Sequence, residues 1–202
     1  MDQDDLPYAG IKVLDLSQGV AGPYCGMHLA RQGADVIKLE PTGTGCWSRQ
    51  LGKPIGDQTA HSLVVHRGKR SLSMDLKHPA GQKLAKQLAA GADVILQNYR
   101  VGKIEKLGLD YAAVRAVNPS VIYLSITGFG AQGPYRDNPA TDSVMQAFTG
   151  MMSINRDLNG LPQRINMLAI DFSTGLYALQ AVSAALYRKA MKGKGQHIRT
   201  SL

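Results

Sequence analysis

The sequence has few cysteines and no long hydrophobic run, and both absences exclude classes of protein. Cys25 and Cys46 form no CxxC motif and have no histidine at metal-ligand spacing, so we expect neither a structural disulfide nor a metal site. The apolar runs are short, such as residues 121–124, whereas a membrane-spanning helix needs ~20 apolar residues. Residues 1–5 are acidic and lack the pattern of a signal peptide. We therefore predict a cytoplasmic protein that does not bind a membrane.

Long blocks of like charge are also absent, although the chain is basic. It has 23 Lys and Arg against 15 Asp and Glu, which gives a formal net charge of +8. The basic residues are dispersed, and no aromatic-rich RNA motif or DNA-reading helix accompanies them. This distribution favours a small anionic ligand and predicts no nucleic-acid partner.

The order of the expected elements indicates an α/β fold. The chain has 202 residues, of which 44% are hydrophobic and 19% are charged, enough for one domain with a core. Strands are expected at 11–16, 35–40, 71–76, 93–97, 121–126 and 196–202. Helices are expected between Pro23 and Arg31 and at 79–91, 101–107, 111–117, 142–152 and 171–191, with loops at 41–56, 128–139 and 155–163. The strands show little alternation of apolar and polar residues, so we predict a parallel sheet with helices on both faces. The last helix is apolar nearly all round, which predicts burial on every side.

Three sites have both a structural and a chemical interpretation. Residues 19–22, Gly-Val-Ala-Gly, form either a tight turn or an anion-binding helix start, and they match neither GxGxxG nor a P-loop. Asp171 is either the N-cap of the last helix or a carboxylate nucleophile. Cys25 lies near a helix start, as a buried spectator or as a reactive thiol. Taken one at a time, these residues favour the structural interpretation.

The combination of motifs is more specific than its parts. Residues 11–16, 21–23 and 33–41 resemble the N-terminus of the family III CoA-transferases. The resemblance continues in the family's order through 69–77, 92–94, 97–100, Gly102, 128–137, 171–186 and 193–196. It implies a Rossmann-like parallel sheet with helices on both faces, of which residues 1–202 are the N-terminal portion of the large domain. The family's small domain and the C-terminal return of the chain would be absent, and the partner would be a second copy in an interlocked homodimer or a complementary C-terminal half.

The resemblance also implies a chemistry and a set of site residues. It makes Asp171 the catalytic aspartate, whose carboxylate attacks an acyl-CoA thioester and passes CoA to a carboxylic acid through anhydride and aspartyl-CoA intermediates. Coenzyme A is then a substrate, and no cofactor is permanently bound. The positions implied to contact it are Gly19, Val20, Ala21, Met74, Lys77, Asn98, Tyr99, Lys106 and Arg136. Pro41 stands where some members have an arginine, so that contact is not expected here.

Two alternatives to a CoA-transferase remain. Racemases of the same family use a histidine at the position of Thr141, and a threonine hydroxyl cannot act as a base near neutral pH. This difference favours CoA transfer over an α-methylacyl-CoA-type racemase. The other alternative is a truncated CoA-binding fragment without turnover.

Overall fold

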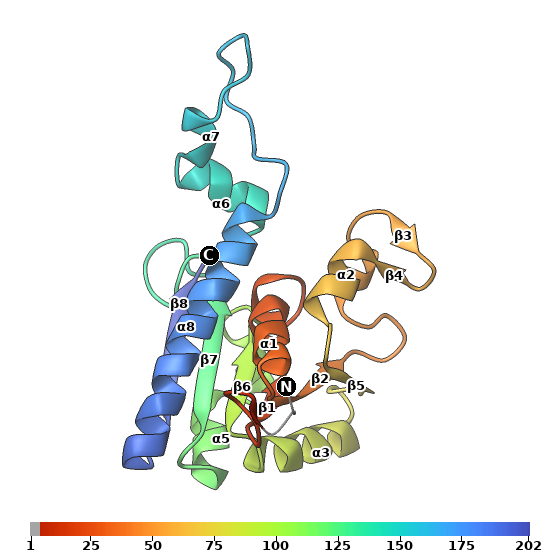
Figure 1. Cartoon of the computed structure of the whole chain (residues 1–202), viewed down its shortest axis with the longest axis vertical. Helices are drawn as coiled ribbons and strands as arrows, with labels where there is room; N and C mark the ends of the chain where they lie inside the picture. Colours follow the sequence, from red (N-terminus) through yellow and green to blue (C-terminus); the bar gives the residue numbers. More distant parts are fainter. Residues whose placement is uncertain (1–4) are drawn as a thin grey trace.

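The computed structural model describes residues 5–202 and shows one six-stranded parallel sheet (Figure 1). Its strands are β1 (Lys12–Asp15), β2 (Asp35–Glu40), β5 (Arg70–Ser73), β6 (Val94–Gln97), β7 (Ile122–Thr127) and β8 (Gln196–Ser201). They lie in the order β5-β2-β1-β6-β7-β8, and every neighbouring pair is parallel. The chain builds outward from β1 to one edge and then from β6 to the other, so the order reverses between β1 and β6. This topology confirms the predicted α/β fold.

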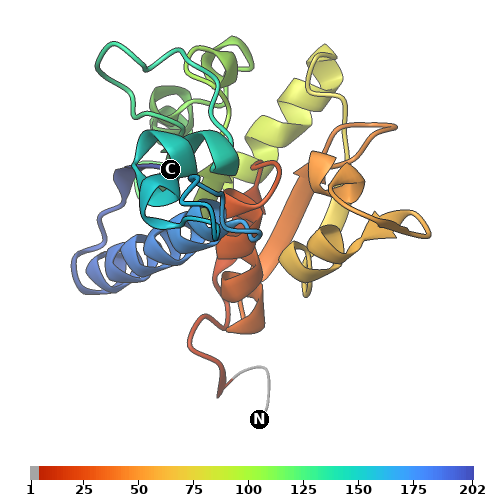
Figure 2. The same cartoon turned by 90° about the horizontal axis from the view of Figure 1, so that it is seen from above.

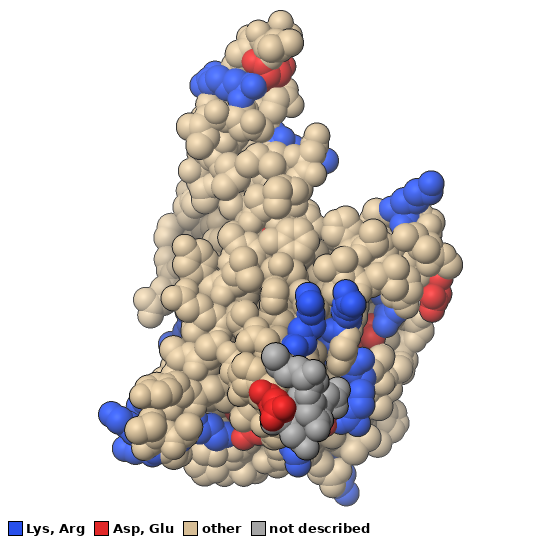
Figure 3. Space-filling view, in the orientation of Figure 1, with Lys and Arg blue, Asp and Glu red and all other residues tan. Residues whose placement is uncertain are grey.

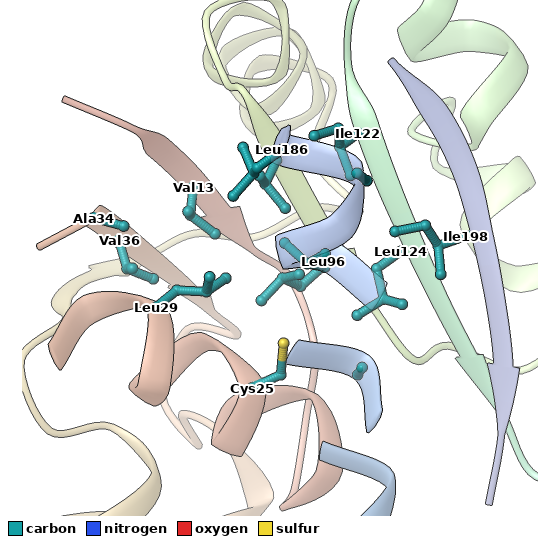
Figure 4. Packing of buried hydrophobic residues seen from close by; sticks show 14 of the residues in the cluster. Val13, Cys25, Leu29, Ala34, Val36, Leu96, Ile122, Leu124, Leu186 and Ile198 are labelled. Carbon is teal, nitrogen blue, oxygen red and sulfur yellow. The ribbon is translucent and has the colours of Figure 1, made fainter. Parts of the chain in front are cut away.

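Helices cover both faces of the sheet (Figure 2). On one face α1 (Ala21–Arg31) and α8 (Ala169–Lys192) pack on the strands through a cluster that includes Leu29, Leu96, Leu124 and Leu186 (Figure 4). On the other face lie α3 (Pro79–Ala90), α4 (Lys103–Lys106) and α5 (Tyr111–Val117), with a second buried cluster. Both faces of the sheet are therefore apolar, which explains the weak alternation along its strands.

The core under the end of β1 contains three buried charges. The Nζ atom of Lys69 lies 2.7 Å from Oδ2 of Asp15, and that of Lys38 lies 3.7 Å from Oδ1. Burial alone would raise the pKa of Asp15, but the two ammonium groups outweigh it and hold that pKa below its usual range. Lys38 also donates to the carbonyl oxygen of Ser17. Two of the basic residues thus fix the chain as it leaves β1.

Several predictions about single elements need correction. The segment predicted as loop at 41–56 contains a 3-10 turn, η2 (Trp47–Gln50), and the strand β3 (Pro54–Ile55). This strand forms a hairpin with β4 (Gln58–Thr59), which α2 (Ala60–Val65) follows. The helix predicted at 142–152 is broken at Gly150, whose φ is +80°, into α6 (Asp142–Phe148) and α7 (Met151–Ile154). The third predicted strand is shorter, because β5 ends at Ser73.

The prediction that the last helix is buried on every side is wrong. One side of α8 packs on α1 and the sheet, whereas Tyr177 and Tyr187 on the other side are each 70% exposed. Within residues 5–202 no helix combines the length and the hydropathy that crossing a membrane requires. The cytoplasmic location was predicted partly from the acidic residues 1–5. Of these, residues 1–4 lie outside the described part of the chain.

Candidate active site

A cleft of about 590 Å³ opens at the carboxyl ends of β1, β6 and β7, next to the point where the strand order reverses. Open parallel sheets place their ligands at this position, because the loops diverge there and leave a crevice. The walls of the cleft come from the starts of α1, α6 and α8 and from the segments after β6 and β7. Among the lining residues are Val20, Ala21, Asn98, Tyr99, Arg100, Arg136, Asp142, Arg164 and Asp171.

The glycine turn before α1 forms one wall of the cleft. Gly19 has a φ of +80°, and a Cβ atom at this position would lie 2.0 Å from the ring of Trp47. Its N–H donates to Sγ of Cys46 at 3.2 Å, so the 3-10 segment packs directly against the turn. Helix α1 begins at Ala21 without a side-chain cap, which leaves N–H groups of its first turn directed at the cleft.

An amide pair joins the ends of β1 and β6 across the point of reversal. The N–H of Gln18 donates to Oδ1 of Asn98, and Nδ2 of Asn98 donates to the carbonyl oxygen of Gln18, both at 2.7 Å. The N–H of Tyr99 donates to Oε1 of Gln97 at 2.8 Å. The side-chain amide of Asn98 thus pairs with the backbone of Gln18, and the bond from Gln97 fixes Tyr99 at the rim of the cleft.

Asp171 lies in the first turn of α8, with its side chain partly buried in the cleft. The helix begins at Ala169 after Leu168, so the N-cap interpretation of Asp171 is wrong. Burial raises the pKa of the Asp171 carboxyl, the charge of Asp142 raises it further, and a hydrogen bond from the Ala21 backbone partly opposes both. The resulting pKa is about 7. A carboxyl that ionises near neutral pH in a cleft is a candidate for covalent or acid–base chemistry.

The sequence did not single out Asp142, which the fold places beside Asp171. Oδ2 of Asp142 accepts the N–H of Asp171 at 2.9 Å, and Oδ1 accepts Nε2 of Gln146 at 2.5 Å. An acidic residue in the first turn of a helix is common, because it interacts favourably with the helix dipole. The sequence pattern around Asp142 therefore gave no sign of a further role.

The predicted coenzyme A positions separate into two groups. Five of them, Val20, Ala21, Asn98, Tyr99 and Arg136, line the same cleft as Asp171, with Gly19 immediately before them in the turn. The structure does not bring the other three to the cleft: Met74 is buried in the core, and Lys77 and Lys106 are exposed elsewhere. Lys103, which sequence reasoning passed over, lies in an adjoining groove with Trp47 and Tyr99.

The distribution of charge and of thiols limits the chemistry further. Lys and Arg are scattered over the visible face rather than gathered in one patch (Figure 3). Cys25 is fully buried, and burial raises its pKa to about 12, so it is a weak nucleophile. Within the described range 5–202, no three His, Cys, Asp or Glu side chains gather as a metal centre would require.

The chain is similar to known proteins over nearly its whole length. The chain is 40% identical to the succinate–glutarate CoA-transferase of Agrobacterium fabrum and 41% identical to the succinyl-CoA:glutarate CoA-transferase of Homo sapiens. Both matches cover 97% of this chain, but 51% and 45% of those two proteins, so the chain spans about half the length of these relatives.

Solved structures of two other proteins also match this chain over nearly its whole length. A CAIB/BAIF family protein from Brucella suis superposes with a TM-score of 0.90 at 39% identity, over 96% of this chain and 52% of that one. A hypothetical protein from Mycobacterium tuberculosis also has a TM-score of 0.90, at 36% identity, over 97% of this chain and 55% of that one. Residues 8–202, and with them the whole cleft, match CoA-transferase family III, and the chain belongs to this family.

Proposed function

We propose that this protein acts in the transfer of CoA from an acyl-CoA to a carboxylic acid, with Asp171 as the nucleophile. The observation that carries the proposal is the Asp171 carboxyl itself, which lies in the cleft against the start of α1 and has a pKa raised to about 7. The relatives named above are CoA-transferases of succinate and glutarate. Short dicarboxylic acids are therefore the first substrates to test.

The proposed reaction begins when the carboxylate of Asp171 attacks the carbonyl carbon of the thioester. The carbon–sulfur bond breaks, CoA leaves as its thiolate, and an anhydride joins Asp171 to the acyl group. The thiolate then attacks the aspartyl carbonyl, which releases the donor acid and leaves aspartyl-CoA. The acceptor carboxylate attacks this thioester and forms a second anhydride. Attack of the thiolate on the acceptor's acyl carbon then releases the new acyl-CoA and restores Asp171.

The surroundings of Asp171 suit these steps. Partial burial removes water that would otherwise solvate the attacking carboxylate or hydrolyse an anhydride. The N–H of Ala21 reaches the carboxyl group and can orient it toward a thioester. Arg100, Arg136 and Arg164 line the cleft, and guanidinium groups bind carboxylates and phosphates well.

The roles of the coenzyme A positions are part of the same proposal. Val20, Ala21, Asn98, Tyr99 and Arg136 are proposed contacts because they share the cleft with Asp171. Met74, Lys77 and Lys106 would need a different placement of the ligand or of the chain. A homodimer or a complementary C-terminal half, and a cytoplasmic location, stay predictions.

The test of this function combines trapping with substitution. The protein, together with a complementary half where one is needed, is incubated with succinyl-CoA, glutarate and hydroxylamine. We expect a hydroxamate at Asp171 in the peptide mass spectrum. Asp171→Ala should lose transfer while keeping coenzyme A binding, because the nucleophile is absent but the other wall residues remain. Asp57→Ala, which removes an exposed carboxyl from the β3–β4 hairpin, is the matched control.

Two outcomes would contradict the proposal. Normal transfer by Asp171→Ala would exclude the covalent role of this residue. Rapid uptake of deuterium from heavy water at the α-carbon of a 2-methylacyl-CoA would favour the racemase instead. The second outcome is not expected, because Thr141 is a poor base and its hydroxyl oxygen accepts the N–H of Val144 at the start of α6.

A further inference from the structure

A second buried carboxyl lies next to Asp171 and is bonded on both of its oxygens. Asp142 is the first residue of α6 and is 3% exposed. One oxygen accepts the backbone N–H of Asp171 and the other accepts the amide of Gln146. Two donors therefore converge on one short side chain. An asparagine could not accept both bonds, because it would turn its own NH₂ group toward one of the two donors.

Gln146, one turn further along α6, extends this connection. It is 1% exposed, its Oε1 accepts the N–H of Ile165 at 2.8 Å, and its Nε2 also donates to the carbonyl oxygen of Met167 at 3.2 Å. The segment that enters α8 is thus tied to α6 at 165, 167 and 171. These buried bonds therefore hold the segment before α8 and the first turn of α8 against α6.

We propose that Asp142 is a positioning residue for Asp171, which holds the backbone of Asp171 in the first turn of α8 and places a second negative charge beside its carboxyl. The proposal rests on the proposed function for its catalytic meaning, but the contacts themselves do not. Asp142 holds Asp171 from outside the helix, at a point where Leu168, the N-cap residue of α8, makes no side-chain bond. It acts through Asp171 and has no assigned contact with substrate.

The electrostatics of the cleft agree with this role. The pKa of Asp171 is raised first by burial and next by the charge of Asp142, and the N–H of Ala21 opposes them. The other charged side chains that line the cleft are Arg100, Arg136, Asp137 and Arg164. None of these four is among the causes of the shift. Asp142 is therefore the charged group whose removal should change the ionisation of Asp171.

The consequence for the reaction is a compromise between basicity and ionised fraction. A carboxylate of higher pKa is a stronger nucleophile, but less of it is ionised below pH 7. Loss of the Asp142 charge should lower the pKa of Asp171, extend activity to lower pH and weaken the nucleophile at high pH. A purely structural role would lower activity at every pH without moving the profile.

The test follows the Asp171 carboxyl directly and needs no activity. The full chain is labelled with ¹³C-aspartate, and Asp171→Asn identifies the Asp171 carboxyl resonance. We expect its titration midpoint near 7 in the unchanged protein. The midpoint should fall in Asp142→Asn and Asp142→Ala and stay in place in Asp57→Asn. Hydrogen exchange should show faster exchange of the Asp171 amide in Asp142→Ala, because its acceptor has gone.

Two results would overturn the proposal. The first is an Asp171 midpoint in folded Asp142→Asn equal to that of the unchanged protein. The second needs no variant at Asp142 and is a midpoint at the ordinary aspartate value in the unchanged protein. If the unchanged protein, with a complementary half where one is needed, carried out no transfer while the titration was as expected, the proposed function would be refuted and the pairing of the two aspartates would stand.

Discussion

At the scale of single residues, Asp171 combines a position that chemistry needs with a cost to folding. Its pKa in the folded protein, about 7, lies above its ordinary value of 3.8. At pH values between these two, the Asp171 carboxyl is ionised in the unfolded chain but keeps its proton in the folded protein. The free energy of unfolding therefore falls as the pH rises from about 4 to about 7 and stays low above that. The shift corresponds to about 4 kcal/mol.

The direction in which the free energy of unfolding changes with pH gives a test that does not depend on activity. Asp171→Asn has no charge to bury, so we expect it to be more stable than the unchanged chain at pH 8 by up to about 4 kcal/mol. Near pH 4 the two should be equal. Urea unfolding at both pH values measures the difference, and Asp57→Asn should show no such dependence on pH. A gain of equal size at pH 4 and pH 8 would contradict the assigned pKa.

At the scale of elements, the contact between α1 and α8 brings Asp171 to the glycine turn. A Cβ atom at Gly175 would lie 2.8 Å from the carbonyl oxygen of Ala21 and 3.0 Å from the ring of Tyr24. Tyr24 and Phe172 meet edge to face, with ring centroids 4.8 Å apart. The absence of a side chain at Gly175 thus lets the two helix starts approach closely enough for Ala21 to bond the Asp171 carboxyl.

We therefore expect Gly175→Val to destabilise the chain by about 1–3 kcal/mol, because the added atoms meet backbone that cannot move freely. The matched control is Gly91→Val, since the nearest atom to a Cβ at Gly91 is 3.9 Å away. Thermal unfolding followed by circular dichroism compares the two variants. Equal losses of stability would show that the close helix contact is not the cause.

At the scale of the whole molecule, a large part of the apolar surface of the chain faces outward. The arm of residues 149–168 extends beyond the sheet (Figure 1), and Ile154, the last residue of α7, is 86% exposed. The outer side of α8 adds Leu176, Tyr177, Tyr187 and Met191, each of them exposed. Monomeric proteins seldom leave such a row of large apolar side chains along one helix exposed.

We expect the 202-residue chain to self-associate at micromolar concentration, because association removes this surface from water. Sedimentation velocity over a range of concentrations measures it. Tyr187→Lys combined with Ile154→Lys should reduce the association, whereas Arg67→Lys, at an exposed polar position, should not. A monodisperse monomer at all concentrations would contradict this expectation.

The sequence alone determined the class of fold and most of the elements. Apolar strands alternate with helices, and proline and glycine mark their ends, so β2 and α5 occur at the predicted residues. For the glycine turn and for Asp171, local motifs alone favoured a structural role, and only the combination of motifs along the chain pointed to a site. The segment from Trp47 to Val65 was not found, since its elements are too short to leave a periodic pattern.

Only the tertiary structure decided which of these residues meet. The reversal of strand order brings Asn98 to Gln18, 80 residues apart, and the packing of α6 against α8 brings Asp142 to Asp171, 29 residues apart. The placement of Met74 in the core, and of Lys77 and Lys106 outside the cleft, depends on how the segments after β5 and β6 pack on the other face of the sheet. A local pattern records burial and chain direction, whereas the ionisation of Asp171 depends on a neighbour that long-range packing alone selects.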